Sequence, residues 1–237
     1  MYEMQFLCLA ASRRDGGSCI AGIDLTSRKW IRPVNARTQG AFADHELIVL
    51  DAGTQKRRFI APLDVLHLTL DKPAGENGQP ENWTMKPKPY EDPYVVIRHL
   101  DGQEIIGELR NYLDHSDRLL HTYTDSVTEV DVRSRPLTHS LALIEPDRLH
   151  WRISDNRKFS NRAQIRADFY FAKTPYSLVV TDPNWEARCR PLGLGRHPHS
   201  TPESAAGEQV LLTVSLAGIP LHGYHYKLVA AVIILPR

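Results

Sequence analysis

The first residues with an evident chemistry form a basic and aromatic run at 28–33, Arg-Lys-Trp-Ile-Arg-Pro. Aromatic faces stack on nucleic-acid bases, and neighbouring cations hold phosphates. On a strand, alternation places Trp30 and Arg32 on one face and Lys29 on the other. With Arg14 upstream, these residues form a first candidate nucleic-acid-binding cluster. The competing interpretation makes Trp30 a core residue among solvated charges.

A second and denser basic segment spans residues 148–166. Asp155 is the only acid within it, and Asp147 lies directly before it. Arginine pairs phosphate in a bidentate manner and also stacks on bases. The binding residues expected in this segment are Arg148, Trp151, Arg152, Arg157, Lys158, Arg162 and Arg166. An ordinary exposed basic hairpin is the alternative. We expect the two clusters to border one groove, in which aromatic rings stack on bases.

Residues 101–131 carry the opposite charge, with eight acids against Arg110 and Arg118. Such a segment should repel phosphate. A helix is predicted from Asp101 to about residue 122, because apolar residues recur near a 3.6-residue period and Asp101 is a suitable N-cap. A protein-interaction module that docks a partner through this acidic helix is therefore one alternative function.

Patterns for catalysis and metal binding are weaker. His197 and His199 with Cys189 could ligate a metal, as could His222 with His225, but neither set has a Cys-x2-Cys or His-Glu-x-x-His context. The sequence contains no Gly-x-Ser-x-Gly elbow, P-loop or Gly-x-Gly-x-x-Gly motif. We therefore expect no metal, no cofactor and no catalysis. A metal-dependent nuclease or nucleotide hydrolase, with carboxylates that converge only in the fold, is the second alternative.

Length and composition set the protein class. The chain has 237 residues, 42% of them apolar and 24% charged, with a net charge of +1, which is typical of globular proteins. Three cysteines without paired spacing argue against a disulfide scaffold and favour a cytoplasmic location. The N-terminus lacks a basic region and a signal-length apolar stretch. The longest apolar run, 228–235, is far shorter than the roughly 20 residues of a membrane span.

The elements that must position these residues are mostly short strands. In the first half, β-forming runs occupy 4–11, 18–25, 29–34, 46–50 and 62–70. Asp15-Gly16 predicts a hairpin turn between the first two. Five prolines between Asp71 and Pro93 predict a long loop. Asp64 and His67, three residues apart on a strand, should lie on opposite faces and have structural roles.

The second half is also rich in strand signals. Residues 164–171 alternate between apolar and polar side chains, and a partner strand, 176–181, is expected across a turn at 173–175. Asp182-Pro183 should start a helix over 184–190. Strands at 209–216 and 226–235 close the chain, and the run 228–235, apolar on both faces, should be central.

Several strings resemble the dual OB-containing domain family of prokaryotes. They are Phe6–Ser12, Cys19–Asp24, Trp30–Val34, Pro62–Val65, Val180–Glu186 and Tyr226–Ala231. The resemblance covers nearly the whole chain and implies a mainly β fold with one or two short helices in two tandem OB-like β-barrels. We place them at 1–135, with the acidic helix, and at 136–237. It also implies a module that binds or senses single-stranded DNA or RNA, often beside bacterial defence genes, with no catalytic motif to transfer.

Overall fold

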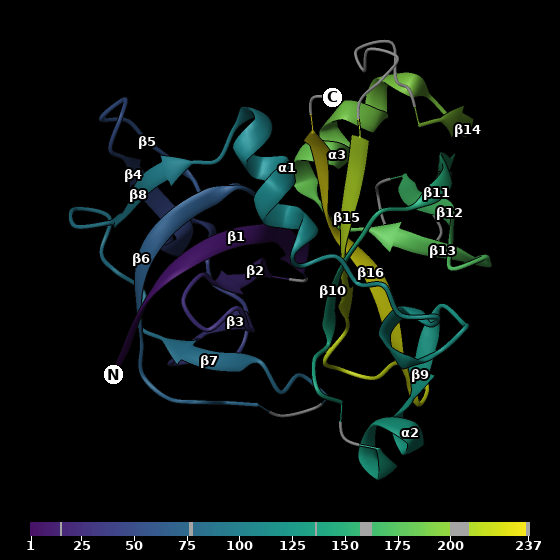
Figure 1. The fold of residues 1–237 in the computed structure, drawn as a ribbon, viewed down its shortest axis with the longest axis horizontal. Coiled ribbons are helices and arrows are strands. Elements are labelled where there is room, and N and C mark those ends of the chain that lie inside the picture. The colour runs from purple at the N-terminus through teal and green to yellow at the C-terminus, as the bar shows by residue number, and fades with distance from the viewer. Residues whose placement is uncertain (15, 76–77, 136, 157–162, 200–208, 236–237) are drawn as a thin grey trace.

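The computed structural model describes residues 1–14, 16–75, 78–135, 137–156, 163–199 and 209–235. Within these residues the chain forms two eight-stranded sheets that lie side by side in Figure 1. The helices described are short: α1 (Gly102–Arg110), α2 (Glu129–Ser134) and α3 (Pro183–Cys189). The expectation of a mainly β protein with short helices is confirmed.

The first sheet has the strand order β5-β4-β8-β6-β1-β2-β3-β7. Its strands are β1 (Tyr2–Arg14), β2 (Gly17–Asp24), β3 (Trp30–Asn35), β4 (Ile48–Asp51), β5 (Arg57–Phe59), β6 (Asp64–Leu70), β7 (Asn82–Met85) and β8 (Tyr94–His99), with the 3-10 helix η1 (Asp44–Leu47) before β4. The five strands predicted in this half correspond to β1, β2, β3, β4 and β6. Strand β1 is buried on both faces, since Phe6 packs into one core cluster and Leu7 into another.

The predicted turn between the first two strands is present. Strands β1 and β2 pair in antiparallel register up to Arg14 and Gly17. Gly16 adopts a φ of 81°, in the left-handed region that glycine enters without steric cost. The hairpin predicted from the Asp-Gly dipeptide is therefore present, although Asp15 lies outside the described residues.

The proline-rich segment 71–93 is not the continuous loop predicted from its composition. It contains β7, which pairs in parallel with β3 from Arg32–Asn82 to Asn35–Met85. No proline occurs from Glu81 to Lys86. The backbone N–H groups needed for a strand ladder are therefore available there. The prolines limit β7 to four residues but do not prevent it.

The second sheet has the order β10-β15-β16-β13-β12-β11-β14, and β9 pairs with β16 off this path. Its strands are β9 (Ser126–Thr128), β10 (Leu141–Ile144), β11 (Asp147–Ser154), β12 (Gln164–Phe171), β13 (Thr174–Val180), β14 (Gly195–Pro198), β15 (Gln209–Leu216) and β16 (Tyr224–Leu235), with the 3-10 helices η2 (Leu119–His121) and η3 (Arg190–Leu192). Strand β16 is central, as its apolar composition predicted.

The hairpin β12–β13 and helix α3 are both present, but the turn lies at 172–173 instead of 173–175, and β13 and α3 begin two residues and one residue earlier than predicted. Phe171 pairs with Thr174, so Ala172 and Lys173 form a two-residue turn, both at positive φ. The side chain of Asp182 accepts from the backbone N–H of Asn184 and Trp185 and so caps α3. A further N–H, from Val232, donates to the other Asp182 oxygen at 2.9 Å and ties α3 to β16.

The acidic helix is shorter than predicted. Helix α1 ends at Arg110 instead of continuing to about residue 122. Past this point the backbone joins the second sheet, because Leu113 bridges Leu143 of β10 and the Asp114 N–H donates to the Leu143 carbonyl at 2.8 Å. Backbone that the apolar periodicity predicted to be helical therefore forms hydrogen bonds with the second sheet instead. Between α1 and β9, the only helical element is the 3-10 helix η2.

The strand pairings run as open paths, so the predicted barrels are not established by them. Two features link strands that are not neighbours in these paths. The backbone after β6 bonds to β7, as the Asp71 N–H donates to the Thr84 carbonyl at 2.8 Å. In the second sheet, β10 and β11 lie near opposite ends of the order yet are separated in sequence only by Glu145 and Pro146. Barrel closure remains a prediction.

The two halves share a core. One cluster contains Leu7 and Leu9 of β1 with Leu211 and Ile233 of the second sheet, and α1 packs on it through Leu109. A smaller cluster joins alanines of β1 and β2 to alanines of β16. The β9 strand at 126–128 pairs with β16 and therefore belongs to the second sheet. The domain boundary at residue 135 itself stays a prediction.

Candidate nucleic-acid interface

The outer face of β11, β12 and β13 gathers arginines around an exposed ring. A bulge between Asp147 and His150 shifts the register of β11 against β12. Bulges bend a strand and redirect side chains. At this bulge Arg148 has a φ of 53°, and its guanidinium lies 5.6 Å from the ring centroid of Tyr170. The result is a solvent-exposed cation on an aromatic ring that is 38% exposed.

Arg152 is fixed beside this pair by a bidentate ion pair. Its Nε donates to Asp168 Oδ2 at 2.9 Å and its Nη2 to Asp168 Oδ1 at 3.1 Å, while Nη2 also donates to Ser177 Oγ at 2.7 Å. Burial alone would raise the pKa of Asp168, but hydrogen bonds from Arg152 and Ser177 lower it overall. A guanidinium has five N–H donors, so these bonds orient Arg152 without using all of its capacity.

Arg166 and Arg196 complete the face. Arg166 donates to the hydroxyl and to the carbonyl of Ser177, and its guanidinium lies 3.7 Å from Asp125. Burial lowers the pKa of Arg166. Arg196 of β14 is exposed and lines the same hollow as Arg148, Arg152 and Tyr170, with a volume of about 390 Å³. The arginine face is hereafter the set Arg148, Arg152, Arg166, Arg196 and Tyr170.

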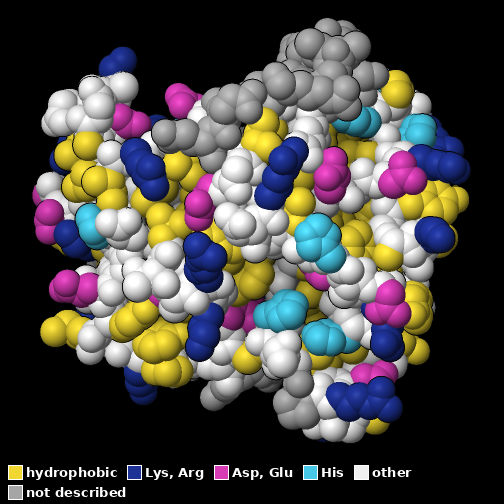
Figure 2. Space-filling model, viewed as in Figure 1, with side chains coloured by type: hydrophobic (Ala, Val, Ile, Leu, Met, Phe, Trp, Pro, Cys, Tyr) yellow, Lys and Arg dark blue, Asp and Glu magenta, His cyan; other side chains and the backbone are white. Residues whose placement is uncertain are grey.

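The acidic segment 101–131, which we expected to repel phosphate, contributes a residue to this surface. Asp125 lies within residues 101–131, yet it lines the hollow of the arginine face. One of its oxygens accepts from the Ser177 N–H at 3.0 Å. With Asp168, it partly neutralises the arginines, so the face is only weakly positive. On the side of the molecule in Figure 2, cationic and acidic side chains are likewise interspersed.

The prediction that Trp151 stacks on bases is wrong for this structure. Trp151 is 0% exposed and belongs to the core of the second half. Its ring lies 4.8 Å from that of Trp185, which is also buried. Strand alternation gives the reason: in β11 the buried positions are Leu149, Trp151 and Ile153, and Arg152 faces the other way. A tryptophan adjacent in sequence to an outward arginine must point inward.

The first cluster is also largely occupied in the fold. The Arg32 side chain is 8% exposed and forms an ion pair of 3.0 Å with Glu81. It also donates to Ser140 Oγ at 2.9 Å and to Ser215 Oγ at 3.1 Å, both in the second half. Arg32 therefore joins the two halves instead of facing solvent. Trp30 is half-buried against the shared core clusters.

Among the described residues, the two clusters line separate cavities. Arg32 lines a cleft between the halves, and Arg152 lines the hollow of the arginine face, and these two cavities have no residue in common. Lys29 is exposed just before β3, whereas the Arg14 side chain lies outside the described residues. Of the second cluster, the residues outside the described part of the chain are Arg157, Lys158 and Arg162.

Comparison with known families gives a clear result. The model of the dual OB-containing domain matches residues 4–232. The chain belongs to this family. Neither a search of curated proteins nor one of solved structures gave a match. Within the described residues, no helix is both long enough and apolar enough to cross a membrane.

Two residues of this dual OB protein's arginine face were missed by sequence reasoning. Tyr170 is the exposed aromatic, and the alternation noted for β12 already placed it on the same side as Arg166. The signal was therefore present in the sequence, although base stacking was assigned to Trp30 and Trp151. Arg196 gave no such signal, because it reaches the face only through the pairing of β14 with β11, where Arg196 lies opposite Arg152.

Histidines considered as metal ligands have other contacts in the dual OB protein. The Nδ1 atom of His225 lies 2.7 Å from the Ala217 carbonyl, and His225 is buried. The Nε2 atom of His197 lies 3.1 Å from the Gly193 carbonyl. In the described residues, no group of three or more His, Cys, Asp or Glu side chains is arranged to hold a metal ion.

Proposed function

We propose that this protein binds single-stranded nucleic acid on the arginine face. The observation that carries the proposal is the position of Arg148 over the exposed ring of Tyr170, beside the oriented guanidinium of Arg152. Base stacking on an aromatic ring, with cations for the backbone, is how proteins hold single strands with little sequence preference.

The order of elements supports this choice of face. The second half contains β10, β11, β12, β13, α3, β14, β15 and β16 in this order, and β13 pairs in parallel with β16. We infer that β10 and β11 act as one bent first strand of a partly open OB barrel. OB barrels bind oligonucleotides on the face of their second and third strands. In this chain those strands are β12 and β13, which carry Tyr170, Arg166 and Ser177.

The setting follows as part of the same proposal. We infer a binding or sensing module in a prokaryotic cytoplasm, in a defence-associated system. The free thiols of Cys8 and Cys189, both buried, fit a reducing compartment. Burial raises the pKa of Cys189 to about 12, so its thiol is protonated and unreactive at neutral pH.

The decisive experiment is a titration of fluorescein-labelled oligo-dT and oligo-rU, followed by fluorescence anisotropy. Tyr170→Ala should weaken binding by about 1–3 kcal/mol, the cost of losing one stacking ring. Arg148→Ala should reduce the salt dependence of the affinity by about 0.7 log unit per log of salt, because one phosphate contact is lost.

A matched control is available in the first half, where Arg57 lies 4.6 Å from the ring centroid of Tyr90. Tyr90→Ala removes a cation–π pair whose ring is also exposed, at 50%, and should leave the affinity unchanged. Equal losses in Tyr170→Ala and Tyr90→Ala, or no loss in either, would contradict the proposed interface. Cleavage of the oligonucleotides in the presence of Mg²⁺ would instead support a nuclease.

A further inference from the structure

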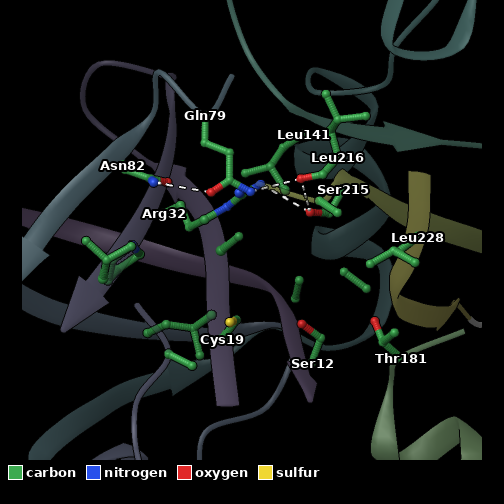
Figure 3. A pocket seen from close by; sticks show the side chains of 18 of the residues that line it. Ser12, Cys19, Arg32, Gln79, Asn82, Leu141, Thr181, Ser215, Leu216 and Leu228 are labelled. Atoms are coloured by element: carbon green, nitrogen blue, oxygen red, sulfur yellow. Dashed lines mark hydrogen bonds between the residues drawn. The ribbon is translucent and has the colours of Figure 1, made fainter. Parts of the chain in front are cut away.

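The cleft between the halves and the hollow of the arginine face differ in what their polar groups contact. In the cleft, shown in Figure 3, Arg32 donates to Ser215 Oγ at 3.1 Å. Beside it, Gln79 donates to the Leu216 carbonyl at 2.9 Å. These bonds join the first half to the second, so they belong to the fold. The hollow of the arginine face is different, because one of its charged partners is held loosely.

Two carboxylates line this hollow, and they are bound with different strength. Asp168 accepts two hydrogen bonds from Arg152, at 2.9 and 3.1 Å, and a third from Ser177 Oγ at 2.6 Å. Asp125 accepts one from the Ser177 N–H at 3.0 Å, whereas the Arg166 guanidinium lies 3.7 Å away, beyond hydrogen-bond length. The Asp125 side chain is 38% exposed, against 21% for Asp168. Asp125 is therefore the carboxylate that a ligand can displace.

The two groups that hold Asp125 are of the kind that binds phosphate. The parallel pairing of β13 with β16 covers Val179 and Val180, and at Ser177 the backbone N–H donates to Asp125 in place of a strand partner. Arg166 is oriented beside this N–H, because it donates from Nε to Ser177 Oγ at 3.0 Å and from Nη2 to the Ser177 carbonyl. These bonds use two of the five N–H donors of a guanidinium. Arginines and backbone N–H groups are common donors to the phosphates of nucleic acids.

The backbone around Asp125 is fixed, so only its side chain has to move. The Lys227 N–H donates to the Asp125 carbonyl at 2.9 Å. The buried Lys227 Nζ donates to the carbonyls of Thr122 and Thr124 at 2.9 and 2.6 Å. Rotation of the Asp125 side chain into solvent therefore leaves its two partners in place for another anion.

We propose that the Asp125 carboxylate occupies a phosphate subsite of the arginine face. In the free protein it takes the place of a backbone phosphate, and a phosphodiester of the bound strand replaces it between the Ser177 N–H and Arg166. Asp125 thereby competes with the ligand and sets its affinity. The identity of the ligand as nucleic acid rests on the proposed function, whereas the subsite is defined by phosphate chemistry alone.

Two substitutions of Asp125 separate occupation of the subsite from a general effect of charge, with fluorescein-labelled oligo-dT as the probe. Asp125→Ala should bind the oligonucleotide about tenfold more tightly than the wild type, because a like charge and a competitor are both removed. Asp125→Asn removes the same charge but keeps an oxygen for the Ser177 N–H, so its gain should be smaller. The control is Asp92→Ala, which removes a 77% exposed acid of the first half and should leave the affinity unchanged.

Inorganic phosphate tests the subsite without nucleic acid. At an ionic strength held constant with chloride, phosphate should raise the thermal midpoint of Asp125→Ala more than that of the wild type or of Asp92→Ala, because a ligand of the native state stabilises it. Thermal midpoints without phosphate verify folding. If Asp125→Ala does not fold, the response of Asp125→Asn to phosphate decides.

The outcomes distinguish the subsite from the proposed function. Oligonucleotide binding that is equally tight in the wild type and Asp125→Ala overturns the subsite and leaves the function standing. Equal gains in Asp125→Ala and Asp125→Asn also overturn it, since they would reflect charge alone. If no variant binds oligonucleotides but phosphate stabilises Asp125→Ala, the proposed function fails and the phosphate subsite is supported.

Discussion

Buried charges in this protein are paired with defined partners. Asp64 is fully buried, and both of its oxygens accept from Arg58, at 2.6 and 2.7 Å. His99 Nδ1 lies 2.8 Å from Asp64 Oδ1. Burial alone would raise the pKa of Asp64, but the bonds from Arg58 and His99 lower it overall. His67 is exposed, whereas Asp64 is buried, which agrees with the opposite faces that the three-residue spacing predicted.

Acid should therefore destabilise the first half through Asp64. Because its folded pKa is below the unfolded value of about 3.9, the stabilisation is complete above that pH and is lost as the pH falls through the folded pKa. Asp64→Asn should lower the free energy of unfolding at pH 7 by about 3–5 kcal/mol, since Arg58 loses its buried partner. Urea unfolding between pH 7 and pH 3 measures both effects.

The control is Asp92→Asn, which removes an exposed contact with Lys88. Its unfolding free energy should stay within the small range typical of surface pairs. If Asp64→Asn retained the acid dependence of the wild type, another carboxylate would be responsible.

At the scale of elements, the β12–β13 hairpin positions the arginine face. Its turn residues, Ala172 and Lys173, have φ values of 47° and 69°. Two-residue hairpins favour this geometry, but residues other than glycine and asparagine enter the left-handed region at a cost. The hairpin is stabilised against that cost by alternating burial along β12 and by the stacked rings of Phe169 and Tyr176.

Replacing Ala172-Lys173 by Asn-Gly should stabilise the protein by about 1 kcal/mol, because these residues adopt the turn with less strain. The measurement is the midpoint of urea unfolding, with oligonucleotide affinity as a second readout. The affinity should not change, since neither residue belongs to the arginine face. A lower midpoint would show that the turn is not strained.

At the scale of the whole molecule, the halves are joined by more than a linker. Core residues of β1 and β16 pack in shared clusters, and the buried Arg32–Glu81 pair bonds to serines of the second half. Tandem domains with a small polar contact usually move independently. The apolar and hydrogen-bonded junction of this protein argues for one folding unit.

We therefore expect a single unfolding transition. In differential scanning calorimetry, the calorimetric and van't Hoff enthalpies should agree, as they do for cooperative unfolding. Arg32→Met should lower the midpoint without splitting the transition, because it removes one partner of a buried ion pair. Two resolved transitions in the wild type would show that the halves fold separately.

Local signals in the sequence were enough for many elements, whereas β5, β7, β8 and β14 were not predicted. Alternation predicted β12, the Asp-Gly dipeptide predicted the first hairpin, Asp182-Pro183 predicted α3, and an apolar run predicted the central strand β16. These features depend on backbone dihedral preferences and on side-chain periodicity, which neighbouring residues determine. Family membership followed from strings distributed along nearly the whole chain.

The sites depended on contacts that local patterns do not contain. Whether Arg32 faces solvent or Glu81 is decided by β7 and by Ser140, which is 108 residues away. Arg196 reaches Arg152 only through strand pairing, and Asp125 approaches Arg166 from a segment that composition alone assigned to a separate acidic surface. Burial and charge pairing are properties of the assembled sheets, so only the tertiary structure decided which outward-facing arginines of β11, β12 and β14 meet and which acids pair with them.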